Sequence, residues 1–160
     1  MNLGLPKKIL KKVSKAIVNT YQIEDFSLET ISIEASVNAQ LTREIKELSL
    51  FKIKSNEELI GYAYLGNAPS KTATFDFLVL FDTDFIVTKT KVLIYREDYG
   101  GEIGSKRWLK QFIGSTKDDN YKPNDNIVAI AGATISVNSM TKAINEVLQD
   151  IGKLQELQVF

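Results

Sequence analysis

The chain contains no cysteine and no histidine among its 160 residues. Without cysteine it has no disulfide, no thiolate nucleophile and no cysteine-ligated iron–sulfur cluster. Without histidine it lacks a common zinc ligand and the base of a serine–histidine triad. Any redox chemistry must therefore come from a bound organic cofactor, because the remaining side chains do not supply it.

The chain also has no excess charge and no long apolar run. Lys and Arg number 20, as do Asp and Glu, so bulk electrostatics give no reason to expect a nucleic-acid partner. The longest apolar stretches, residues 75–81 and 127–131, are far too short to span a bilayer. The N-terminus lacks the apolar core and cleavage site of a secretory signal. We therefore expect a cytoplasmic protein, with peripheral contact to the inner face of the membrane as the alternative.

After the first helix the pattern shifts toward the alternation of apolar and polar residues that is typical of strands, most clearly over residues 28–34. This pattern, together with short apolar runs, predicts strands at residues 28–34, 50–54, 59–65, 73–81, 86–96 and 126–130. Helical spacing predicts helices at residues 5–21, 39–48, 104–113 and 139–151. Because the strands follow one another closely and the helices flank them, the expected fold is a single α+β domain with a mainly antiparallel sheet.

The N-terminal segment, residues 1–22, is expected to form a basic amphipathic helix. Over residues 5–21 the apolar side chains share one face, while the lysines occupy the other. One interpretation is a surface helix packed on the domain, with its lysines in solvent. The other is a helix that lies on an anionic membrane or docks onto an acidic redox partner. The sequence leaves both interpretations open.

Small and hydroxyl residues precede the last predicted helix in the run Ala131-Gly132-Ala133-Thr134-Ile135-Ser136-Val137. Gly132 and Ala133 let the backbone approach an anion closely, and the amides of a first helical turn point at such an anion. The hydroxyls of Thr134 and Ser136 can donate further bonds. The pattern fits a phosphate-binding turn, and it also fits a helix that only caps itself.

A second stretch lies upstream and runs from Tyr95 to Gly104, followed by Trp108 and the segment 111–114. The two stretches together resemble the landmarks of the FMN-binding domain family. That family includes the C subunit of the sodium-pumping NADH:quinone oxidoreductase and the G subunit of the Rnf complex. Its members have a Glu-Thr-Pro-Gly-Leu-Gly-like turn, then a helix with an aromatic residue, and later a Ser-Gly-Ala-Thr-x-Thr/Ser motif. The resemblance is strongest over residues 58–151, and residues 23–160 are expected to form the FMN-binding-like domain.

The resemblance implies an FMN-binding flavoprotein that carries electrons between redox protein partners, rather than a stand-alone enzyme. The flavin phosphate would be held by Gly132, Ala133, Thr134, Ile135 and Ser136. The flat ring needs backbone and aromatic surface. We expect Tyr99, Gly100 and Gly101 to supply it, because adjacent glycines let the backbone approach a ring face closely. Glu97 or Glu102 would bond the ribityl hydroxyls or tune the ring. The alternative is a module that keeps the fold without flavin and binds another phosphorylated ligand or a partner protein.

Neither a catalytic residue nor a metal site is expected from the remaining polar residues. No general base with an oriented partner is visible, so nothing indicates hydrolysis. The acidic loop at residues 118–126 lacks the ligand spacing and closing glutamate of an EF-hand.

Two positions depart from the pattern that the family uses for covalent attachment. In members that carry FMN covalently, a flavin transferase esterifies the phosphate onto the threonine that aligns with Thr134. The transferase reads an aspartate six residues before that threonine and usually a hydroxyl residue three before it. Val128 and Ala131 occupy these positions here. We therefore expect FMN to be held without a covalent bond, or to be attached incompletely.

Overall fold

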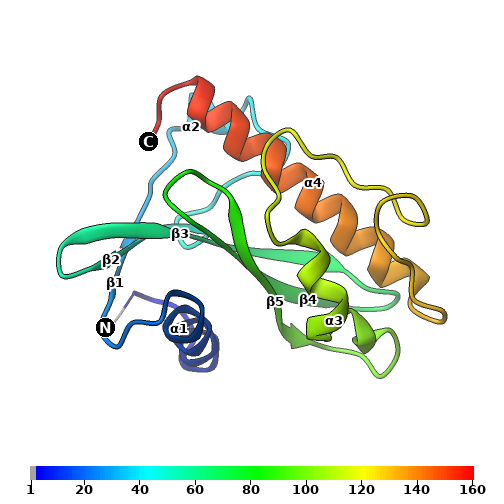
Figure 1. Cartoon of the computed structure of the whole chain (residues 1–160). Helices are drawn as coiled ribbons and strands as arrows, with labels where there is room; N and C mark the ends of the chain where they lie inside the picture. Colours follow the sequence, from blue (N-terminus) through cyan, green and yellow to red (C-terminus); the bar gives the residue numbers. More distant parts are fainter. Residues whose placement is uncertain (1–2) are drawn as a thin grey trace.

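The computed structural model describes residues 3–160. Its strands form one five-stranded antiparallel sheet in which they lie in chain order (Figure 1). The strands are β1 (Ser27–Thr30), β2 (Leu50–Ser55), β3 (Glu58–Pro69), β4 (Thr74–Phe81) and β5 (Val87–Tyr95). Each strand pairs with the next one along the chain, so the sheet is a simple meander. The expected α+β fold with a mainly antiparallel sheet is confirmed.

Helices cover both faces of the sheet (Figure 1). α1 (Lys7–Tyr21) lies on one face, and α4 (Thr134–Glu156) lies on the other together with α3 (Lys106–Leu109). Successive strand residues point to opposite faces. Phe77 and Val79 of β4 accordingly join the core under α4, whereas Leu78 joins the core under α1.

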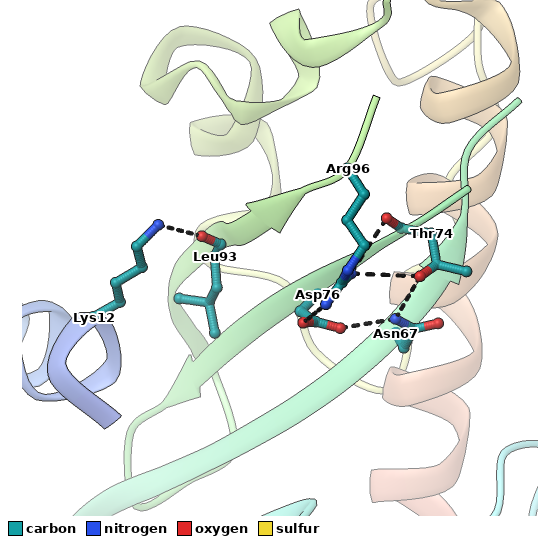
Figure 2. Close-up of polar contacts among 6 residues, drawn as sticks. All are labelled: Lys12, Asn67, Thr74, Asp76, Leu93 and Arg96. Carbon is teal, nitrogen blue, oxygen red and sulfur yellow. Dashed lines mark hydrogen bonds and ion pairs between the residues drawn. The ribbon is translucent and has the colours of Figure 1, made fainter. Parts of the chain in front are cut away.

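The N-terminal helix packs tightly on the sheet. Its buried residues are Ile9, Val13, Ala16 and Ile17. The Lys12 ammonium donates a 2.6 Å hydrogen bond to the Leu93 carbonyl, which ties α1 to β5 (Figure 2). The apolar face of α1 is therefore filled by the protein itself, and the lysine face remains outside. Within residues 3–160, no helix is both long and apolar enough to cross a bilayer.

Two expected elements are replaced by loops. Residues 39–48 were expected to be helical, but the helix in this part of the chain is α2 (Ala35–Asn38), which ends before residue 39. The buried Asp150 carboxylate accepts hydrogen bonds from the amides of Thr42 and Arg43 (2.7 and 2.8 Å), and this holds the segment in turns. The expected strand at 126–130 makes only an isolated bridge between Pro123 and Ile127.

The remaining helices differ from expectation in their bounds. Residues 101–112 form η1 (Gly101–Gly104), α3 and η2 (Lys110–Phe112) in place of one helix. The break falls at Ser105, whose backbone is extended while its hydroxyl caps α3 by accepting from the Trp108 amide. The last helix begins at Thr134, earlier than predicted, so Thr134 and Ser136 lie inside its first turn. β1 also ends sooner than predicted, at Thr30.

Candidate functional site

The two landmark segments meet where β5 ends. The Tyr95 hydroxyl donates to the Tyr99 carbonyl at 2.6 Å and lies 2.8 Å from Ser136 Oγ in α4. Because a tyrosine hydroxyl has a single proton, Ser136 is the donor in the second bond. One hydroxyl group therefore holds the loop after β5 against the first turn of α4.

Gly100 makes this junction sterically feasible. Its φ of +82° is a conformation that side-chain-bearing residues rarely adopt. A Cβ placed on it would lie 2.6 Å from the Tyr95 hydroxyl oxygen and 3.1 Å from Ser136 Oγ. The glycine predicted from the family landmark is therefore required by the packing of this junction.

The turn before α4 presents unpaired backbone donors. Its N-cap residue is Ala133, and no side chain in the described part of the chain caps the helix. The first bond into the helix runs from the Val137 amide to the Ala133 carbonyl (2.9 Å), so the amides of residues 134–136 precede the hydrogen-bonded ladder. Gly132 has a φ of +80°, and a Cβ placed on it would meet nothing within 4 Å. The turn combines free amides with open space, as an anion-binding turn requires.

A small pocket of about 210 Å³ brings most of the predicted site residues together. It is lined by Lys71, Glu97, Tyr99, Gly100, Gly132, Ala133, Thr134, Ile135 and Ser136. Two predicted residues lie elsewhere, since Gly101 begins η1 and Glu102 lines a neighbouring pocket. Lys71 is the residue that the sequence analysis missed. It follows β3 in a loop with no motif, and its only signal is a positive charge.

Glu97 fixes the loop that carries Lys71. Its carboxylate accepts bonds from the Lys71 amide (2.9 Å), the Thr72 amide (2.8 Å) and the Thr72 hydroxyl (2.6 Å). The Thr72 hydroxyl bond and then the backbone bonds hold the pKa of Glu97 below its usual range. In this arrangement Glu97 positions Lys71 at the pocket.

Acidification is expected to release this loop. A lowered pKa in the folded state means that the stabilisation is present above the ordinary glutamate pKa of about 4.3 and is lost as the pH falls through the lowered value. The amide NMR signals of Lys71 and Thr72 should therefore titrate at a pH below the ordinary glutamate pKa. In Glu97→Gln this titration should disappear, whereas in Glu102→Gln it should persist. Equal titration in the parent and in Glu97→Gln would show that another group holds the loop.

A larger pocket of about 590 Å³ adjoins the turn, since Ala131 lines this pocket and Gly132 lines the small one. Its walls are Glu102, Ser105, Arg107, Trp108, Lys110, Gln111 and residues 128–131. The backbone of Val128 is held by two side chains: it accepts from Trp108 Nε1 at 2.7 Å and donates to the Gln111 amide oxygen at 2.8 Å. This wall is therefore rigid without belonging to a strand.

Exposed apolar side chains surround the turn. Tyr99 is 80% exposed, Val128 68% and Ile135 50%. Large apolar groups gathered in solvent around one concave feature are typical of a ligand or partner site. The small pocket supplies anion donors, and its surroundings supply apolar surface.

Another hollow, of about 630 Å³, lies beside the start of α1. Two of the acidic groups in its wall are paired. Glu146 bonds to Arg43 (3.4 Å). Asp76 bonds to Arg96 (2.6 Å) and accepts from the Asn67 amide (2.7 Å), as Figure 2 shows. None of the landmark residues lines it. The landmark residues instead line the two pockets beside the α4 turn.

Comparison with known proteins assigns this region to a family. Residues 71–149 match the model of the FMN-binding domain family, a span that contains both landmarks. This match confirms the resemblance to that family and supports FMN as the cofactor. The crystal structure of Shewanella oneidensis NqrC has a similar fold, with a TM-score of 0.58, 13% sequence identity, and coverage of 88% of this chain and 92% of that one. At this identity the likeness concerns the fold. No curated protein matches the sequence significantly.

Proposed function

We propose that the protein is an FMN-binding electron carrier whose flavin phosphate is bound by the turn at residues 132–136. The uncapped first turn of α4, inside the segment that matches the FMN-binding family, is the observation that carries the proposal. When bound, FMN supplies the capacity to take up and release one or two electrons. The protein contributes binding, orientation and access.

The phosphate is held by neutral donors and one cation. The amides of residues 134–136 and the exposed Thr134 hydroxyl donate to its oxygens. Lys71 offsets its charge from across the small pocket. The Ser136 hydroxyl already donates to Tyr95, so its role is to position the turn.

The isoalloxazine ring occupies the larger pocket. The small pocket, at about 210 Å³, is below the range of roughly 300–1,000 Å³ that is usual for cofactor-sized ligands, whereas the larger pocket lies inside it. Residues 128–131 form one wall, and Glu102 is placed to tune the ring or to bond the ribityl chain. Tyr99 lines the small pocket and is 80% exposed.

The electron donor and acceptor are redox proteins in this proposal. An anionic membrane at residues 5–21 is the alternative partner, and the structure limits how it would bind. The residues Ile9, Val13, Ala16 and Ile17 of α1 are buried against the sheet, so lipid would meet mainly the lysines and the attraction would be chiefly electrostatic.

Non-covalent attachment is tested by intact mass and by the visible spectrum. After co-expression with a flavin transferase, the protein is expected to keep the mass of the apoprotein, show flavin absorbance, and release FMN into the supernatant on acid precipitation. Introducing Val128→Asp and Ala131→Ser should allow attachment, because both restore the transferase motif and both side chains lie at exposed positions.

Two outcomes would count against these statements. A full mass increase of one FMN less one water in the parent protein would show that the transferase does not need the missing aspartate. A protein without flavin absorbance at saturating FMN would support the flavin-free module in place of the electron carrier.

A further inference from the structure

Charge is strongly segregated in this neutral protein. Residues 5–21, 87–95 and 103–113 contain half of the chain's 20 Lys and Arg residues and none of its 20 Asp and Glu residues. The remainder of the chain is correspondingly acidic. A zero net charge therefore conceals one basic region.

The three basic segments are neighbours in the fold. α1 and α3 both contact β5 (Figure 1), and the Thr90 hydroxyl of β5 donates to the Leu109 carbonyl of α3 at 2.9 Å. Burial and the charges of Lys15, Lys89, Lys12 and Lys106 lower the pKa of Lys91. Lysines from all three elements are thus close enough to repel one another.

These cations lie on adjoining elements, and we call them together the basic surface. It consists of Lys12, Lys15, Lys89, Lys91, Lys106, Arg107 and Lys110. Four of them line a pocket of about 250 Å³ that has no acidic residue in its wall. None of the seven takes part in an ion pair within residues 3–160. A concentration of unpaired like charge costs stability, which is consistent with a use in binding.

The basic surface reaches the proposed flavin ring. Arg107 and Lys110 line both the 250 Å³ pocket and the 590 Å³ pocket. Ile113, whose apolar side chain is 50% exposed, also lines the 250 Å³ pocket. Cations that surround an apolar contact directly beside a redox group suit transient docking, in which a partner protein approaches the flavin closely and then dissociates.

We propose that the basic surface docks an acidic electron-transfer protein, whose redox centre then faces the flavin pocket; the flavin part of this statement rests on the proposed function. A protein partner fits better than lipid because most of the apolar face of α1 is packed against the sheet and because the cations extend along β5 and α3 to the ring pocket. Complementary charge accelerates such encounters and makes them sensitive to salt.

The test uses two probes that differ in charge but share one redox centre: native cytochrome c, which is basic, and succinylated cytochrome c, which is acidic. Binding is measured calorimetrically with the FMN-free and the FMN-loaded protein. Electron transfer is measured by stopped flow after reduction of bound FMN with dithionite. A reduced flavin gives up two electrons and each ferric haem accepts one, so two haems are reduced per flavin while the flavin's proton passes to solvent.

The test variant carries Lys15→Glu, Lys89→Glu and Lys106→Glu. These lysines belong to the basic surface, and none of them lines the ring pocket. The control carries Lys46→Glu, Lys117→Glu and Lys142→Glu, three exposed lysines outside the basic surface. Both triple variants change the net charge equally, and FMN affinity is expected to stay unchanged in both.

The parent and the control should bind the acidic probe and reduce it faster than the basic probe, with a preference that shrinks as salt rises. The test variant should lose about tenfold or more in the rate with the acidic probe. Equal responses of the two triple variants would overturn the proposal. So would parent protein that ignores the acidic probe but sediments with anionic vesicles, since the surface would then serve lipid. A protein that binds the acidic probe without binding FMN would retain the docking surface and refute the flavin function alone.

Discussion

Replacement of Gly132 by valine is expected to abolish FMN binding while leaving the protein folded. Gly132 has a φ of +80°, which costs a β-branched residue roughly 1–2 kcal/mol. Its Cβ direction is open, so the new side chain would occupy space beside the free amides instead of clashing with the core. A flavin fluorescence titration should show an affinity loss of about a hundredfold or more, equivalent to roughly 2.8 kcal/mol.

Gly114→Val is the matched control for this experiment. Gly114 also has a positive φ (+91°), and a Cβ placed on it would meet nothing within 4 Å, but it lies at the end of the α3–η2 segment. Both variants carry the same type of backbone strain, and their thermal stabilities should fall by similar amounts. If Gly132→Val binds FMN as tightly as Gly114→Val, the phosphate is bound elsewhere.

The sheet was predictable from the sequence because its signal is local. Short runs of apolar residues, partly alternating with polar ones, predicted the strands that became β2 to β5, whose side chains divide between two cores. The prediction of a helix at 39–48 was wrong because two backbone amides of this segment, those of Thr42 and Arg43, donate to Asp150, a residue far along the chain. The strand expected at 126–130 failed because Trp108 and Gln111 satisfy the backbone of Val128. Hydrogen-bond partners that are distant in the sequence produce no periodic pattern in it.

The candidate site was predictable where it has a motif and hidden where it depends on contact. The family landmarks led to Gly100 and to the turn at 132–136, which the fold brings into one pocket. Nothing local pointed to Lys71, which Glu97 holds at that pocket. The basic surface was not predicted for a related reason. Its charges lie in three separate segments, and acidic residues elsewhere cancel them in the net charge.

Removal of the Tyr95 hydroxyl should loosen the site without opening the core. Tyr95→Phe loses the donor to the Tyr99 carbonyl and the acceptor of the buried Ser136 hydroxyl. Two such bonds together are worth roughly 1–3 kcal/mol, and a chain of this length loses about 2–4 °C in Tm per kcal/mol. The FMN dissociation constant should rise about tenfold, or roughly 1.4 kcal/mol, because the loop after β5 is no longer fixed to the phosphate turn.

Tyr62→Phe provides the comparison, because it removes the same atom from a tyrosine at the opposite end of the sheet, where Tyr62 stacks on Phe85 at 4.0 Å. Its FMN affinity should equal that of the parent. Ser136→Ala and the double variant Tyr95→Phe/Ser136→Ala complete a cycle. If the Tyr95–Ser136 bond couples the two segments, the double variant loses less affinity than the sum of the single losses. Strict additivity would mean that the phosphate turn is held in place independently of Tyr95, and the junction would then have no part in binding the cofactor.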